Sequence, residues 1–159
     1  MPEKIIRFRI RRPRATISRQ MLSKGCHGSE SIIILSLFLL TSCSEINTTD
    51  PVDAYQYWAG EKPPKSVEVV RAKYWQSAHW TKEYVLFLKI KPNDEWWTEF
   101  VLQNGLKRDD GQWAVPSDSP DWFQLPANVT LYRPGDNLFE SRFFRDDQTG
   151  ECYIYDIQL

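Results

Sequence analysis

The chain has 159 residues, enough for a single domain, and a formal net charge of −1. That charge is unevenly divided along the sequence. Residues 1–42 contain eight Lys and Arg against two Asp and Glu, whereas residues 43–159 contain twelve against nineteen, a net charge of −7. An acidic domain is unsuited to binding nucleic acid or anionic lipid through its overall field, so we expect no nucleic-acid partner.

The segment before residue 43 has the features of a cleaved signal. Its apolar run, residues 32–40, is interrupted only by Ser36 and is too short for a membrane-spanning helix, which needs about 20 apolar residues. The run fits the apolar region of a secretory signal peptide, with a core strand as the alternative. Residues 1–30 allow three interpretations: a long basic leader, an Arg-rich transit peptide, or translation from Met21, which we favour because it gives a leader of ordinary size.

The residues Leu40-Thr41-Ser42-Cys43 resemble a bacterial lipobox, the end of a lipoprotein signal peptide. The resemblance covers roughly residues 21–43 and implies that the Cys43 thiol receives a diacylglyceryl group. Cleavage before Cys43 and acylation of its amine would then give a stably anchored protein, because two or more acyl chains are needed to hold a protein on a membrane. Ser44 stands where an inner-membrane retention signal has aspartate, which favours a periplasm-facing place on the outer membrane.

Cysteine and histidine are too few for the common structural sites. With Cys26 removed with the signal and Cys43 lipidated, Cys152 is the remaining thiol, so we expect no intramolecular disulfide. His79 is likewise the remaining histidine, and one chain could not build a Cys/His zinc site. We therefore expect no metal and no cofactor.

The first half of the predicted domain begins with a spacer. Residues 43–66 are expected to be a lipidated tether with polar and Pro-rich stretches. Within it, the aromatic residues of 50–60 predict a short turn of helix or strand that docks on the domain. Residues 67–76 and 83–91 are rich in β-branched and aromatic side chains and predict an antiparallel hairpin. Residues 92–105 predict a helix, capped by Asn93 or Asp94, with its tryptophans turned toward the sheet.

The second half is predicted to be mostly irregular until its end. Residues 106–138 contain four prolines and two glycines, and only the stretch at 128–132 resembles a strand. Residues 139–159 predict a closing hairpin whose turn uses Gly150. The result is an α+β fold with one helix on a small antiparallel sheet, in the order ββα-ββ. We expect a signal at 1–42, a tether at 43–66 and one domain at 67–159.

The loop aromatics are the candidate binding residues. Trp80, Trp113, Trp122 and Phe123 fall in segments rich in Pro, Asp and Ser, and Asp121 lies beside two of them. They could fold back onto the core, as small domains often require, or form a recognition surface, where Trp is enriched. Tryptophan beside carboxylates suits a sugar or a basic protein surface.

The sequence contains only weak indications of catalytic activity. No nucleophile motif accompanies His79. The carboxylate pairs usually cap helices or solvate turns; they are Asp94/Glu95/Glu99, Asp109/Asp110, Asp118/Asp121 and Asp146/Asp147. We therefore expect a non-enzymatic, lipid-anchored envelope module that binds a protein or a glycan. The alternatives are an immunity-type inhibitor of a basic toxin and a carboxylate-dependent hydrolase. The stretches DEWWTEF, PDWF and SRFFRD…TGECYIYDIQL resemble uncharacterised small bacterial lipoproteins, which implies no activity.

Overall fold

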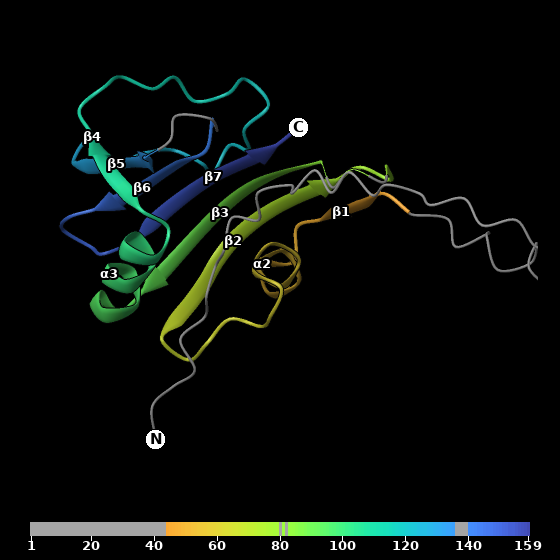
Figure 1. Cartoon of the computed structure of the whole chain (residues 1–159), viewed down its shortest axis with the longest axis horizontal. Coiled ribbons are helices and arrows are strands. Elements are labelled where there is room, and N and C mark those ends of the chain that lie inside the picture. Colours follow the sequence, from red (N-terminus) through yellow and green to blue (C-terminus); the bar gives the residue numbers. More distant parts are fainter. Residues whose placement is uncertain (1–43, 80, 82, 136–139) are drawn as a thin grey trace, which may run out of the picture.

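The computed structural model describes residues 44–79, 81, 83–135 and 140–159. In this part of the chain, seven strands form one antiparallel sheet accompanied by two helices (Figure 1). In chain order the elements are β1 (Ile46–Thr48), α2 (Pro51–Ala59), β2 (Val67–Gln76), β3 (Tyr84–Pro92), α3 (Asp94–Gln103), β4 (Leu106–Asp109), β5 (Val129–Pro134), β6 (Arg142–Asp146) and β7 (Cys152–Gln158). The predicted α+β class with an antiparallel sheet is confirmed.

The order of strands across the sheet is β1-β2-β3-β7-β6-β5-β4. The two predicted hairpins, β2–β3 and β6–β7, are confirmed, and they join side by side where β3 pairs with β7. The β3 strand is therefore internal, as its apolar residues on both faces indicate. The turn between β6 and β7 contains Gly150 at a φ of 72°, a left-handed conformation that favours glycine.

The helix face of the sheet carries the larger core. Its centre consists of Tyr74, Leu86, Leu88 and Ile154, each fully buried. Helix α3 begins as predicted, with the Asn93 side chain accepting a hydrogen bond from the Trp96 amide. Trp97 and Phe100 of α3 are buried on this face, which confirms that the helix turns aromatic side chains toward the sheet.

Helix α2 covers the same face beside β2 and β3 (Figure 1). The Asp50 side chain caps its start, and Gly60, at a φ of 82°, ends it. Ala54 and Tyr55 are completely buried, so the helix is held by the core. The predicted docking of the aromatic stretch at 50–60 is confirmed. The domain nevertheless begins earlier than residue 67: β1 and α2 extend it back to residue 46, because buried aromatic area outweighs the polar character of the flanking stretches.

A second core occupies the opposite face. Phe87, Phe144 and Tyr153 form its base on three adjacent strands, and the long segment between β4 and β5 lies over them. This segment, residues 110–128, runs above the strands in Figure 1. The Nζ of Lys73 donates a 3.0 Å hydrogen bond to the Asp118 carbonyl and fastens the segment to β2.

One strand was not predicted from the sequence. Residues 106–109 were expected to be irregular, but they form β4 and pair with β5 in the register Leu106↔Pro134 to Asp109↔Leu131. The stretch LKRD lacks a β-rich pattern because three of its four residues are charged. Charged side chains are typical of edge strands, where they discourage pairing with another chain.

Candidate functional site

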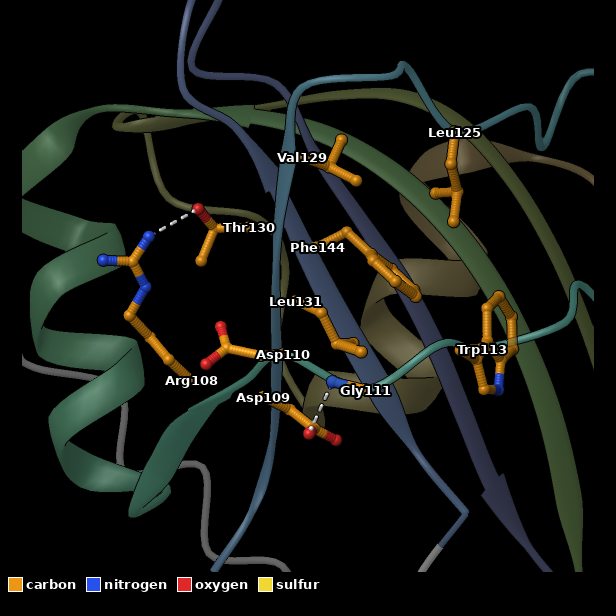
Figure 2. A pocket seen from close by; sticks show the side chains of 10 residues that line it. All are labelled: Arg108, Asp109, Asp110, Gly111, Trp113, Leu125, Val129, Thr130, Leu131 and Phe144. Atoms are coloured by element: carbon orange, nitrogen blue, oxygen red, sulfur yellow. Dashed lines mark hydrogen bonds between the residues drawn. The ribbon is translucent and has the colours of Figure 1, made fainter.

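A hollow opens where β4 ends and the chain passes onto the second face of the sheet. It has a volume of about 380 Å³ and lies between residues 108–113 and residues 125–131. Figure 2 shows Leu131 and Phe144 in its middle, with Trp113 on one side and Arg108 on the other. The hollow is open and its exposed lining is mostly polar, whereas most small-ligand pockets are enclosed and largely apolar.

Trp113 forms the aromatic wall and is held firmly. Its ring centroid lies 5.1 Å from that of Phe144 and 5.4 Å from that of Tyr155. The side chain is half-buried, so part of the indole remains available. The wall therefore exists before any ligand arrives, which lowers the entropic cost of binding.

Polar side chains line the edges of the hollow from both faces of the sheet: Asp109 lies on the face of Trp113, whereas Arg108 and Thr130 lie on the helix face. The Asp109 carboxylate lies 3.2 Å from Nε of Arg133 and accepts a hydrogen bond from the Gly111 amide. Arg108 donates a 3.0 Å hydrogen bond to the Thr130 hydroxyl (Figure 2), and that hydroxyl donates to Asp147. Asp110 is exposed, and its carboxylate has no hydrogen bond or ion pair with the described residues.

The structure separates the predicted binding residues. Trp113 lines the hollow, whereas Trp122 is half-buried with its ring 5.8 Å from Phe123, and Asp121 is exposed. Phe123 is 1% exposed and packs edge-on against Phe87 at 5.1 Å. Phe123 is thus a core residue, and its prediction as a surface contact is corrected: a small domain buries a large apolar ring wherever the chain allows.

Two predicted sites, Trp80 and Cys43, lie outside the described residues. His79 is exposed, with Nδ1 3.5 Å from a carboxylate oxygen of Glu83. Cys152 is completely buried, and burial raises the pKa of its thiol.

A buried carboxylate that the sequence analysis missed lies on the helix face. Asp156 of β7 is 8% exposed and accepts hydrogen bonds from Trp58 Nε1 at 2.7 Å, Tyr84 Oη at 2.8 Å and the Ser141 hydroxyl. Burial, followed by the charge and hydrogen bond of Asp156, raises the pKa of Tyr84. The network joins α2, β3 and the residue before β6 to strand β7. In the sequence, the only sign of it is a single Asp among the apolar residues of the last strand.

The other predicted carboxylates have structural partners or face solvent. Asp94 forms an ion pair with Arg145, and Asp146 accepts hydrogen bonds within its own turn. The Thr149 hydroxyl and the Gln148 amide lower the pKa of Asp146. Across the described residues, no group of three or more His, Cys, Asp or Glu could hold a metal ion.

Among the described helices, none combines the length and the apolar character needed to cross a bilayer. No known protein family, curated protein or solved structure matches the chain. The candidate site therefore depends on geometry alone. That geometry places the Trp113 wall and the Asp109 carboxylate on the second face of the sheet, whereas the Arg108 guanidinium lies on the helix face.

Proposed function

We propose that the chain is an envelope lipoprotein, held on a membrane by a lipid on Cys43, whose domain binds a protein or a glycan without catalysing a reaction. The resemblance of residues 40–43 to a lipobox supports the anchor. The binding role is supported by one observation above all: the hollow beside Trp113, with a rigid ring, an apolar base and exposed polar groups. We also propose that the protein lies on the outer membrane and faces the periplasm, because Ser44 follows Cys43 where an inner-membrane retention signal has aspartate.

The non-catalytic part of the proposal follows from how the charges are engaged. A glycoside hydrolase needs two carboxylates facing each other across a cleft. In the hollow the two carboxylates, Asp109 and Asp110, are consecutive in the chain, and Asp109 is already held by Arg133 and Gly111. The arrangement suits positioning of a ligand better than acid–base chemistry.

Site-specific photo-crosslinking in intact cells tests the proposal. A photoreactive residue at Gln112, exposed beside Trp113, should yield an adduct with an envelope component in the membrane fraction. The matched control is Gln56, an exposed glutamine on α2 that lies over the opposite face of the sheet. Equal adducts from both positions, or none from Gln112, would count against a binding role for this face.

An immunity-type inhibitor of a basic toxin is the second candidate function. Residues 110–128, the segment that covers the second face, contain three Asp and no Lys, Arg or His, so this segment is acidic. Electrostatic complementarity of this kind accelerates association with a basic partner. A basic protein that is crosslinked at Gln112 and released by high salt would favour this alternative over an uncharged ligand.

A further inference from the structure

One end of the sheet lies next to the residue that is proposed to carry the lipid. The register places one residue from each of four strands in a single row: Ile46 of β1, Gln76 of β2, Tyr84 of β3 and Gln158 of β7. The β2–β3 turn beyond this row lies beside β1 at the right of Figure 1, and α3 lies at the other end of the strands. We use the term anchor end for the described residues just beyond the row, which are 44–45, 77–79, 81, 83 and 159.

The chain between the proposed lipid and the sheet is too short to act as a flexible tether. Only Ser44 and Glu45 separate Cys43 from Ile46, the first residue of β1. An extended chain advances by at most about 3.6 Å per residue, so the Cα atoms of residues 43 and 46 can be at most about 11 Å apart. Glu45 is itself fastened, because its Oε1 accepts a 2.5 Å hydrogen bond from Nε1 of Trp75 on β2. A lipid on Cys43 would therefore keep the anchor end beside the lipid head groups.

Charge opposes the other ways in which the domain could lie on a membrane. Tipping it onto the second face would bring the three Asp of residues 110–128 toward the lipid. Tipping it onto the helix face would do the same with α3, since residues 94–103 contain three acidic residues and no Lys, Arg or His. Anionic lipids repel such segments. Residues 76–84, by contrast, contain one Lys and one Glu, and Leu159 adds an apolar side chain that is 83% exposed.

The hollow lies toward the other end of the same strands. Thr130, which lines it, pairs with Arg145, and Arg145 pairs with Cys152 on β7. Cys152 and Gln158 are the two ends of β7, and the six residue steps between them correspond to about 20 Å of strand at about 3.3 Å per residue. An anchor at the Gln158 end therefore leaves the hollow open to the compartment outside the membrane.

We propose that the short connection to Cys43 holds the anchor end against the lipid head groups of the membrane, so that the hollow faces away from them. The inference rests on the proposed lipid at Cys43 and adds the surface of the domain that the membrane contacts. Strand β1 is central to it, because its pairing with β2 makes residues 46–48 part of the sheet instead of a spacer. A weak contact with lipid is sufficient, since the connection makes it intramolecular and raises its effective concentration.

The test measures the distance of two labelled positions from the lipid surface by energy transfer. Thr81→Cys places a donor dye in the β2–β3 turn, and Gln148→Cys places it in the β6–β7 turn; both residues are exposed. Each variant is extracted from membranes, labelled and added to vesicles of phosphatidylcholine and phosphatidylglycerol that carry an acceptor dye on their head groups. The dye at position 148 should lie farther from the lipid surface than the dye at position 81 by about 20 Å or more, the length of strand between the two turns.

A spacer variant is the matched control for the short connection. Insertion of about 20 Gly and Ser residues between Ser44 and Glu45 adds a flexible linker with an end-to-end distance of about 25 Å. It should lower the energy transfer from position 81 and narrow the difference between the two positions. The parent chain should take up no dye, because Cys152 is buried. Circular dichroism and the unfolding temperature of each variant show whether the domain is intact, and intact mass shows whether it carries the lipid.

Two results in a folded protein of lipidated mass overturn the orientation and leave the proposed anchor standing. One is equal energy transfer from the two positions, or stronger transfer from position 148. The other is transfer from position 81 that the spacer leaves unchanged, since the short connection would then not hold the domain in place. If the extracted protein carries no acyl chains and does not bind the vesicles, the proposed anchor and the orientation both fail.

Discussion

The indole Nε1 of Trp58 donates a 2.7 Å hydrogen bond to Oδ2 of Asp156, and so joins helix α2 to the last strand of the sheet. Ninety-eight residues separate the two in the chain. The Tyr84 hydroxyl shares the same carboxylate oxygen, and the Ser141 hydroxyl donates to the other. Burying a carboxyl group is costly unless its oxygens are hydrogen-bonded, so these donors compensate Asp156 for the water that it loses inside the fold.

Asp156→Ala should therefore destabilise the domain strongly. The change leaves donors from three elements without their acceptor, and each buried unsatisfied group costs about 1–3 kcal/mol. We expect a loss of about 3 kcal/mol or more in the free energy of unfolding, measured by urea denaturation. Trp58→Phe removes one donor and should cost about 1–2 kcal/mol.

The control for this network is Asp121→Ala, an exposed aspartate without a described partner. A surface change of this kind should stay within about 0.5 kcal/mol of the parent protein. If Asp156→Ala matched that control, the network would not hold α2 to the sheet, and the extension of the domain back to residue 46 would need another explanation.

Phe123→Ala should be costly because the ring is part of the second core. Phe123 is 1% exposed and contacts Phe87 and Tyr153 edge-on. Deleting a buried Phe side chain typically costs about 3–5 kcal/mol. Trp122→Ala should cost less, since that ring is only half-buried. Chemical denaturation compares the two, and a larger loss for Trp122→Ala would contradict the assignment of Phe123 to the core.

The stability of the β6–β7 turn should depend on pH through Asp146. Its hydrogen bonds from Thr149 and Gln148 lower its pKa below the ordinary value of 3.8. As pH falls through 3.8, the unfolded chain takes up a proton on Asp146 before the folded chain does, so the stabilisation is present above 3.8 and is lost toward the lower folded pKa.

Asp146→Asn cannot show this titration. The difference in unfolding free energy between the parent and Asp146→Asn should be constant at neutral pH and shrink below about pH 4. A series of denaturant titrations at decreasing pH measures it. A difference that remained unchanged down to strongly acidic pH would contradict the hydrogen-bonded carboxylate.

Cys152 should be protected from alkylation in the folded protein. Its side chain is completely buried, its Sγ lies 3.6 Å from the Gly150 carbonyl, and burial raises the pKa of the thiol. Thiolate, the reactive form, is thus scarce and inaccessible. Peptide mass mapping after iodoacetamide treatment at mildly alkaline pH should find Cys152 unmodified without urea and modified with it. Rapid modification of the folded chain would contradict its burial.

Much of the fold follows from local patterns in the sequence. The β2–β3 and β6–β7 hairpins and helix α3 have strong local signals: β-rich runs, the Gly150 turn and the Asn93 cap. The structure departs from prediction where contacts between distant segments, rather than local sequence, determine whether an element forms. Helix α2 is only nine residues long, and its stability depends on Tyr55 in the core and on the bond from Trp58 to Asp156.

The candidate site could be predicted only in part, for the same reason. Trp113 is a candidate from the sequence because it lies in a segment rich in Pro, Asp and Ser, and Trp is enriched at recognition surfaces. The sequence could not distinguish it from Phe123, since exposure of a loop aromatic depends on which strands the loop covers. Arg108 and Asp110 join the hollow because β4 pairs with β5, a pairing of distant segments that no local pattern indicated.

The proposed lipid on Cys43 can be tested by the intact mass of the protein extracted from membranes. We expect one species with the mass of residues 43–159 increased by a diacylglyceryl group and an amide-linked acyl chain. We also expect Cys43→Ala to abolish both cleavage and acylation. A membrane-bound protein with the unmodified mass of a longer chain, or a Cys43→Ala variant that matures and stays with the membrane as the parent does, would contradict it.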